Sequence, residues 1–307
     1  PSPTAHKTPS LLVLFAGKVG GLYGRHDGST ADPRVIERTA EGIHRRIIEP
    51  NRARGWRVDI AAHSWDMEVV PTIRRHYDLI AEDFVSYPDR RDTRLYMGTE
   101  GGQYWGWDRA MELRRRVERE RGGEYDLVLL LRWDLVFFTD FVVDGLRRDV
   151  IHVAHWCRAV GPESSVLKNK RRCRSLEKFM GDDNKGVPDF WFLGSSKQMD
   201  SLFSNLWERL HERRVEPYTK VWGAHGVVAA FADHLHIPFG RYLYHHMDFD
   251  FIREVDHDRL QCAEKGLIWE HPHDDAVAPS RYSRCQTLGY CACTQAQFSL
   301  RAFKERP

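Results

Sequence analysis

The sequence has no run of 18 apolar residues, so no segment of it is expected to cross a membrane as a helix. It also has almost no charge excess, because 46 Lys and Arg residues face 44 Asp and Glu residues and give a formal net charge of +2. Such a balance does not indicate a nucleic-acid partner, and none is expected. With 307 residues, of which 42% are hydrophobic, the chain is long enough to bury a large core and is predicted to be globular.

Cysteine is sparse, and four of the six cysteines fall in the last fifth of the chain. The pattern has three interpretations: disulfide bonds in an oxidising compartment, free thiols, or a zinc site that joins late cysteines to His271 or His273. No paired CxxC spacing is present, and spacing alone does not assign disulfide pairs. The six positions are Cys157, Cys173, Cys262, Cys285, Cys291 and Cys293.

The first ten residues, PSPTAHKTPS, are rich in Pro, Ser and Thr and contain no apolar run. We interpret residues 1–10 as the remnant of a stem or linker. A stem implies an anchor or signal further upstream, so contact with a membrane is expected only through such an anchor. Together with the even number of cysteines, this favours the lumen of the secretory pathway (Golgi or ER), with the cytoplasm as the alternative.

Short apolar runs alternate with helical patterns through the first 140 residues or so. Strands are expected at 11–17, 56–65, 81–85 and 127–131, and helices at 32–48 and 107–117. Asp32 and Pro33 have the residue types of a helix N-cap and a first helical residue. Because the runs are apolar on both faces, we predict an α/β, Rossmann-like fold with a mostly parallel central sheet flanked by helices.

The second half of the chain is less regular, and we predict that it belongs to the same domain. Strands are expected at 149–156 and 188–196, and helices at 195–214 and 218–237. The basic run RRRVERERGG at 114–123 is interpreted as the solvated face of a helix. The single domain would span 11–307, with a nucleotide-binding half at 11–140, an acceptor and sugar half at 141–255, and an irregular, cysteine-bearing tail at 256–307.

Polar residues follow three of the predicted strands, at the edge where parallel α/β sheets bind ligands. The three groups are Gly17-Lys18, His63-Ser64-Trp65-Asp66 and Arg132-Trp133-Asp134. In YDLVLLLRWDLVFFTD, at 125–140, the last group separates two apolar runs. We therefore interpret Arg132 and Asp134 as the functional end of a buried strand.

The segment GKVGGLYGR, at 17–25, is rich in glycine but matches neither of two common phosphate-binding patterns. It lacks the GK[ST] that closes a Walker A loop, and it is not a GxGxxG fingerprint. A glycine-rich turn with Lys18 and Arg25 can still hold a diphosphate through backbone N–H groups and positive charge. A flexible surface loop is the alternative.

Asp134 is the strongest candidate ligand for a metal. A carboxylate near a diphosphate needs a cation between them, and Mg²⁺ or Mn²⁺ prefers hard oxygen ligands of this kind. Arg132 lies two residues earlier and points to the same side of an extended chain, so it can pair with Asp134 or contact the diphosphate. The alternative is a purely structural ion pair.

The segments LFAGKVGGLYGR, VDIAAHSWD, YDLVLLLRWDLVFF and VPDFWFLGSSKQMDSLF, in this order, resemble nucleotide-sugar-dependent glycosyltransferases of the GT-A fold. The likeness covers roughly residues 11–245 and is greatest to a group in which an R-x-D element replaces the usual D-x-D. It implies that Asp134 meets the metal, with His246 as a second ligand, and that Arg132 is an alternative source of positive charge. The nucleotide contacts implied are Gly17, Lys18, Arg25, His63, Asp66, Arg109, Arg132 and Trp133.

The same resemblance places PDFWFLGSS on the acceptor and sugar side of the site. Asp189 is then expected to contact the sugar or to act as general base, with structural capping as the alternative. His225, in WGAHG, lies where many related enzymes carry a carboxylate. It is expected to be a base or a metal ligand, with core packing as the alternative.

These features predict an enzyme, a hexosyl- or pentosyltransferase. It would move a sugar from a nucleotide-diphosphate sugar, with UDP as one candidate nucleotide, to a hydroxyl of a glycan or glycoprotein. One alternative is a non-catalytic glycan-binding or scaffold protein that retains the fold. Another is a different phosphate-handling transferase, such as a sulfotransferase or kinase, although the first turn lacks their phosphate-binding signature.

Overall fold

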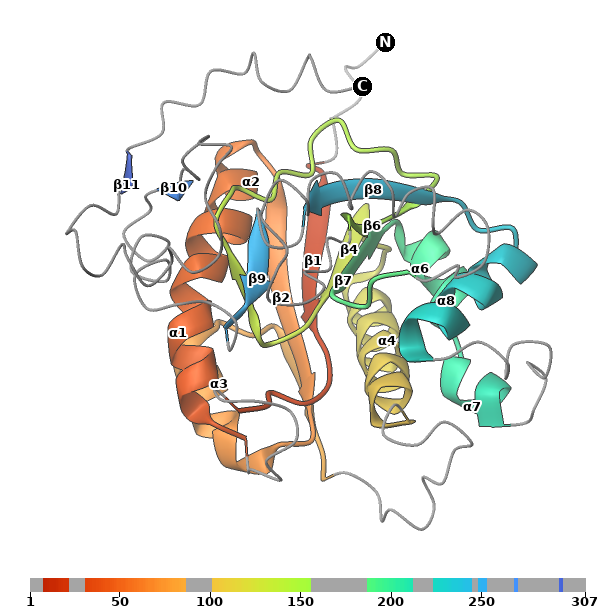
Figure 1. Cartoon of the computed structure of the whole chain (residues 1–307), viewed down its shortest axis with the longest axis horizontal. Coiled ribbons are helices and arrows are strands. Elements are labelled where there is room, and N and C mark those ends of the chain that lie inside the picture. Colours follow the sequence, from red (N-terminus) through yellow and green to blue (C-terminus); the bar gives the residue numbers. More distant parts are fainter. Residues whose placement is uncertain are drawn as a thin grey trace, which may run out of the picture.

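The computed structural model of the chain describes residues 8–21, 31–86, 101–155, 187–211, 223–244, 248–252, 268–269 and 293–294. A seven-stranded sheet in the order β3-β2-β1-β4-β7-β6-β8 forms the centre of this part of the chain (Figure 1). Its strands are β1 (Ser10–Phe15), β2 (Arg57–Ser64), β3 (Ala81–Phe84), β4 (Leu127–Leu131), β6 (Ile151–His155), β7 (Trp191–Gly194) and β8 (Phe239–Tyr244).

The sheet is parallel in its first half and mixed in its second. Strands β3, β2, β1 and β4 are neighbours and run in parallel, as the sequence predicts for the first 140 residues. Strand β7 is antiparallel to both β4 and β6, whereas β6 and β8 are parallel to each other. The predicted α/β fold with a mostly parallel sheet is therefore confirmed, and the change of direction occurs between β4 and β7.

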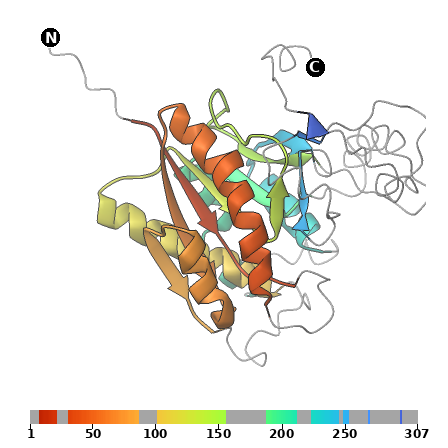
Figure 2. The same ribbon diagram turned by 90° about the vertical axis from the view of Figure 1, so that its left-hand side faces the viewer.

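Helices cover both faces of the sheet (Figures 1 and 2). Alternate residues of β1 face opposite sides, so that Leu11 and Val13 pack in the same core as α1 while Leu12 and Leu14 pack in the same core as α4. The helices are α1 (Pro33–Ile43), a π-helical turn (His44–Ile48), α2 (Glu49–Ala53), a 3₁₀ turn (Met67–Val69), α3 (Val70–His76), α4 (Gly101–Arg121), α6 (Ser196–Phe203), α7 (Leu206–His211) and α8 (Gly223–His234).

Helix α1 begins at the residue that the sequence predicts. The Asp32 carboxylate accepts a hydrogen bond from the backbone N–H of Arg34 at 3.0 Å, and Pro33 is the first helical residue. Proline is suited to this position because its missing N–H would have no partner within the helix. Val35, Ile36 and other apolar residues at helical spacing are buried against the sheet.

The single helix predicted at 195–214 is instead two helices, α6 and α7. The break lies at Ser204 and Asn205, where Asn205 has a φ of 53°, a left-handed conformation that asparagine tolerates better than most residues. The backbone N–H of Leu206 donates to the Asp108 carboxylate of α4 at 2.8 Å. A contact with α4 thus gives the first backbone N–H of α7 a hydrogen-bond partner. The helix predicted at 218–237 is present as α8.

The basic run at 114–123 is not simply a solvated face, as the sequence predicts, because Arg114 and Glu118 are both buried. Arg114 donates to Glu118 at 2.9 Å and also pairs with Asp200 of α6. Glu118 accepts further hydrogen bonds from the Ser196 hydroxyl and, at 2.9 Å, from the backbone N–H of Tyr125. Part of the run is therefore an exposed basic surface, and the rest is a buried ionic network that joins α4 to α6.

Two further two-stranded sheets complete the part that the structure describes. One pairs β5 (Leu135–Phe137) with β9 (Phe249–Phe251), and the other pairs β10 (Ile268–Trp269) with β11 (Cys293–Thr294). The cysteines other than Cys293 lie outside the described residues, so the predicted disulfides stay predictions. Among the described segments, no helix combines the length and apolar character needed to span a bilayer.

The buried network on α4 makes a prediction about stability. Replacing Arg114 by Met leaves the carboxylates of Glu118 and Asp200 without their shared cation, so the free energy of unfolding should fall by about 3 kcal/mol or more. The exposed Arg119 of the same helix is the control, and Arg119→Met should change it by less than about 0.5 kcal/mol. Urea unfolding measures both, and equal losses would contradict a structural role for the network.

Candidate functional site

The segment Arg132-Trp133-Asp134 is the exit of β4 from the main sheet. Strand β4 is buried along its whole length, and the chain then enters β5, which pairs with β9 in a separate sheet. The backbone N–H of Ile252 donates to the carbonyl of Asp134 at 2.9 Å, which ties this exit to the end of β9. The arginine and the aspartate are therefore part of a turn between two sheets and do not interrupt one strand.

Arg132 and Asp134 form a two-point ion pair at this exit. The arginine Nε donates to one carboxylate oxygen at 2.9 Å, and Nη2 donates to the other at 2.8 Å. Both side chains are largely buried, with exposed fractions of 17% for Arg132 and 9% for Asp134. The guanidinium also lies 4.9 Å from the ring centre of Phe251, a distance typical of a cation–π contact.

Asp189 lies beside this pair because of the direction of β7. Leu131, the last residue of β4, is opposite Trp191, the first residue of β7, so residues just before β7 come to the carboxyl end of β4. The Asp189 carboxylate is 3.9 Å from Nη1 of Arg132 and accepts a hydrogen bond from Nε2 of Gln103 at 2.6 Å. We call Arg132, Asp134, Asp189 and Gln103 the β4-exit cluster.

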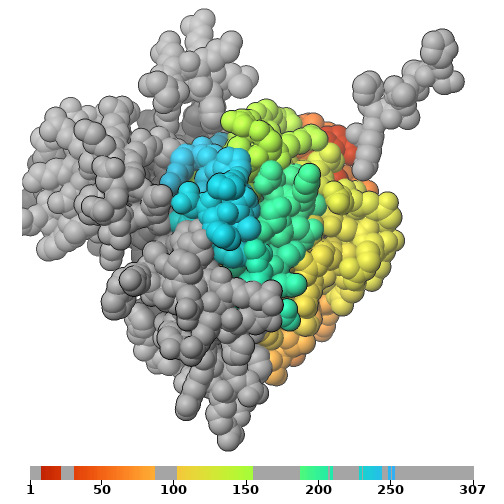
Figure 3. All heavy atoms as spheres, turned by 90° about the vertical axis from the view of Figure 1, so that its right-hand side faces the viewer, coloured from red at the N-terminus to blue at the C-terminus, as the bar shows by residue number. Residues whose placement is uncertain are grey.

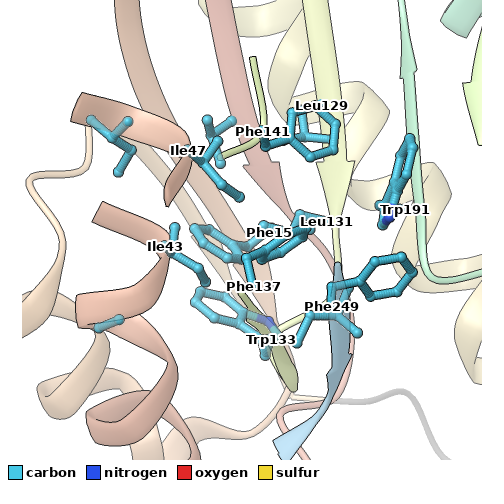
Figure 4. Close-up of a cluster of buried hydrophobic side chains, with 14 of the residues drawn as sticks. Phe15, Ile43, Ile47, Leu129, Leu131, Trp133, Phe137, Phe141, Trp191 and Phe249 are labelled. Atoms are coloured by element: carbon cyan, nitrogen blue, oxygen red, sulfur yellow. The ribbon is translucent and has the colours of Figure 1, made fainter. Parts of the chain in front are cut away.

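Trp133, predicted as a nucleotide contact, faces the opposite way. Its side chain is fully buried and stacks on Phe15, with ring centres 4.3 Å apart and an interplanar angle of 11° (Figure 4). The turn at 132–134 thus directs its middle side chain into the core. The structure assigns Trp133 to core packing and leaves the rim to its two neighbours.

The loop after β1 is held by a carboxylate from the end of β2. Asp66 is buried and accepts the backbone N–H of Val19 at 2.8 Å. Burial raises the pKa of Asp66, although this hydrogen bond and the nearby Lys18 oppose the shift. Gly17 has a φ of 93°, which favours glycine, and Lys18 is exposed at the same edge. Asp66 thus holds the backbone of the loop that is predicted to bind a diphosphate.

Trp65 is inserted between two glycines from different elements. A Cβ on Gly106 of α4 would lie 2.8 Å from the Trp65 ring and 3.1 Å from the Cα of Gly17. The ring of Trp105 lies 5.8 Å from that of Trp65 and 5.3 Å from that of His63. This close approach brings the ends of β1 and β2 against the first turns of α4, directly beside the glycine-rich loop.

His63 and Arg109, both predicted nucleotide contacts, are joined through Asp83 near the end of β3. Nδ1 of the buried His63 lies 3.0 Å from the Asp83 carboxylate, and Nε and Nη2 of Arg109 donate to it at 3.0 and 2.7 Å. Burial alone would raise the pKa of Asp83, but hydrogen bonds from His63 and Arg109 outweigh it and lower the pKa to about 2. Arg109 is held at the outer side of α4.

Three of the predicted site residues are not placed. Arg25 and His246 lie outside the described residues, and His225 belongs to α8 without a described side chain. Over the described ranges, no three His, Cys, Asp or Glu side chains gather as a group that could hold a metal ion. The metal predicted at Asp134 and His246 therefore stays a prediction.

Sequence reasoning missed Gln103, Asp83 and Phe251, which all contact predicted site residues. Asp83 had a detectable signal, because it is a polar residue near the end of the third predicted strand, at the same edge as the other polar groups. Gln103 and Phe251 come from a helix start and a short late strand, and their proximity depends on tertiary packing.

Comparison with known proteins adds no assignment. No family model matches the sequence. No curated protein matches it either.

The pKa of Asp83 predicts a pH-dependent contribution to stability. A carboxyl whose pKa falls from 3.8 to about 2 on folding stabilises the protein above pH 4 by about 2 kcal/mol, and this stabilisation is lost as the pH falls through 2. The gap in unfolding free energy between wild type and Asp83→Asn should therefore narrow between pH 5 and the lowest pH at which both still fold. Urea titrations at several pH values measure it, and a gap independent of pH would contradict the low pKa.

The packing of Trp65 makes a second prediction at this edge. Gly106→Ala places a methyl group against Trp65 and the Gly17 backbone, so it should cost about 1–3 kcal/mol of unfolding free energy and shift tryptophan emission. Gly42→Ala, in α1, is the matched control because a Cβ there meets nothing within 4 Å. It should be neutral or stabilising by up to about 1 kcal/mol. Similar losses in the two variants would contradict the Trp65 contact as the cause, because Gly42→Ala creates no such contact.

Proposed function

We propose that the protein is a glycosyltransferase that moves a sugar from a nucleotide-diphosphate sugar to a hydroxyl of a glycan or glycoprotein. The observation that carries this proposal is the β4-exit cluster, where a guanidinium lies between two largely buried carboxylates at the carboxyl end of β4. Ligands of open α/β sheets bind at this edge. The glycine-rich loop after β1 ends at the same edge, since β1 and β4 are parallel neighbours.

Each part of this edge suits one part of such a reaction. The loop at Gly17 and Lys18 offers backbone N–H groups and a positive charge for the diphosphate. Arg132 offers a planar guanidinium, which recognises phosphate oxygens in pairs. Asp189 is the candidate proton acceptor for the attacking hydroxyl, and Gln103 fixes the orientation of its carboxylate. Asp66 and Trp65 would support the loop without touching the reacting atoms.

A divalent cation at Asp134, Mn²⁺ or Mg²⁺, would supply charge neutralisation for the departing diphosphate. Both oxygens of Asp134 accept hydrogen bonds from Arg132, so such a cation would share this carboxylate with the guanidinium or displace it. Nucleotide binding with and without the metal therefore belongs in the same experiment.

The same ion pair favours a second candidate function, a non-catalytic glycan-binding protein that retains the fold. Arg132 neutralises the carboxylate that would otherwise attract a metal, which a protein without catalytic activity would tolerate. The compartment proposed for either function is the secretory pathway lumen, because an even number of cysteines suits an oxidising environment.

Nucleotide binding is the first test. UDP- and GDP-sugars, each with Mn²⁺, Mg²⁺ or EDTA, are added to wild type and Asp134→Asn while melting temperature and slow donor hydrolysis are followed. A donor at about 100 times its Kd should stabilise wild type by about 2.7 kcal/mol. This stabilisation should be lost in Asp134→Asn and kept in the exposed control Asp149→Asn. If glycans stabilise the protein and no nucleotide does, the glycan-binding function replaces the transferase.

Asp189 allows a sharper test of catalysis. Asp189→Asn keeps the shape of the side chain and one oxygen that can accept from Gln103 but removes its basicity, so donor binding should change little. Transfer to the acceptor should fall by about 10² to 10⁴. Steady-state kinetics with the donor found above measures kcat and KM separately. A rise in KM with unchanged kcat would show that Asp189 contacts the sugar and does not act as the base.

A further inference from the structure

A polar concavity lies on the outer side of α4, where β3 ends. It has a volume of about 340 Å³, within the range of small-ligand pockets. Figure 3 shows α4 (yellow) at the molecular surface beside α6 and α7 (green). The concavity is lined by Asp83, Arg109, Glu112, Leu113, Arg115, Arg116 and Arg119.

The lining carries a surplus of positive charge. Four guanidinium groups face two carboxylates, so its formal charge is +2. Arg109 is matched by Asp83 and Glu112, which lie within 2.7 and 3.0 Å of its nitrogens. Arg115 is matched by Asp200 of α6 at 3.2 Å. The carboxylates therefore compensate one end of the concavity and leave the other end basic.

The uncompensated charges belong to Arg116 and Arg119. Both side chains are exposed, and neither forms an ion pair within the part of the chain that the structure describes. Nη2 of Arg116 donates to the carbonyl of Glu82 at 2.9 Å, which orients the guanidinium without neutralising it. Two cations side by side repel each other, so an anion placed between them would lower the energy of both.

The basic groups are partly fixed before any ligand arrives. Arg109, Arg115 and Arg116 are each held by a hydrogen bond to a neighbouring element, and the Arg115 Nη1 also donates to Ser204 at 2.8 Å. From Arg109 to Arg119 the helix rises by about 15 Å. Part of the entropic cost of ordering long side chains, which usually opposes binding, is therefore already met for three of the four arginines.

We propose that this concavity is a binding site for oxyanion esters, and specifically for a sulfated or phosphorylated oligosaccharide. Guanidinium groups form paired hydrogen bonds with the oxygens of sulfate and phosphate. The elongated arrangement along α4 fits a ligand that bears more than one such group. The proposal does not depend on nucleotide-sugar transfer, since Arg116 and Arg119, whose charge carries it, belong neither to the β4-exit cluster nor to the predicted nucleotide contacts.

A nucleic acid is a less suitable occupant. Its backbone places a charge at regular short intervals and is matched by long basic tracks, whereas the surplus here is confined to one concavity. The chain as a whole has a formal net charge of only +2 and lacks the excess that draws proteins to nucleic acids. A short saccharide with few ester groups meets the local charge without requiring a larger basic surface.

The test uses a heparin-derived sulfated tetrasaccharide and a phosphorylated mannose oligosaccharide as probes, with the uncharged tetrasaccharide maltotetraose as the ligand control. Binding is measured by calorimetry for wild type and for the double variant Arg116→Gln/Arg119→Gln. The matched variant is Arg38→Gln/Arg75→Gln, which removes two exposed arginines from α1 and α3. Melting curves for all three proteins show whether each one folds.

At least one anionic probe should bind wild type, and the α4 double variant should weaken it by about tenfold or more, the effect of losing one hydrogen bond to a charged group. The matched variant should change the affinity by less than about twofold. Three results would overturn the proposal. They are equal weakening in both variants, binding of maltotetraose as tight as that of the anionic probes, and no binding of either anionic probe. Tighter binding of a single-stranded RNA of the same charge would also overturn it. UDP binding is measured separately, and its failure would count only against the glycosyltransferase.

Discussion

The position of β4 at the centre of the sheet is the constraint on which the candidate site depends. β4 is buried along its length and pairs in parallel with β1 on one side and antiparallel with β7 on the other. The parallel pairing brings the glycine-rich loop to the edge where β4 ends, and the antiparallel pairing brings the start of β7 there. Backbone hydrogen bonds between strands thus place Asp189 near Arg132, and the two side chains approach to 3.9 Å.

The pairing of buried charged side chains is a second constraint on this structure. Burying an ionised group costs several kcal/mol unless it is paired and hydrogen-bonded. Arg114 is compensated by Glu118 and Asp200, and Asp83 is compensated by Arg109 and also hydrogen-bonded to His63. Where the lining becomes exposed, along the outer side of α4, compensation is incomplete. The positive surplus therefore lies at the surface, where water lowers its cost and a ligand can reach it.

The edge proposed to bind a nucleotide sugar and the concavity proposed to bind oxyanion esters are linked by a series of side-chain contacts. The glycine-rich loop touches Trp65, whose ring neighbours His63, and His63 reaches Arg109 through Asp83. Asp83 is therefore a shared structural element, since it contacts an imidazole near the edge proposed to bind the nucleotide and an arginine in the α4 concavity. Hydrogen bonds and ring contacts thus connect the two surfaces.

Much of the first half could be predicted because its signals are local. Apolar runs of strand length, the Asp32 N-cap and the helical spacing in α1 each act within a few residues, so neighbouring sequence is sufficient to read them. Local patterns did not predict three features: the inward direction of Trp133, the burial of Arg114 and the helix break at Asn205. Each of these depends on a partner far along the chain: Phe15, Asp200 and Asp108 respectively.

The sequence by itself determined the α/β class, the strands of the parallel half and the identity of the polar residues at their ends, because alternation and turn chemistry are encoded locally. The tertiary structure alone decided the direction of β7, and with it the meeting of Asp189, Gln103 and Arg132. It also decided that Arg109 lines a separate basic concavity. The reason is physical: strand direction and charge pairing are set by contacts between segments tens of residues apart, and local periodicity carries no information about them.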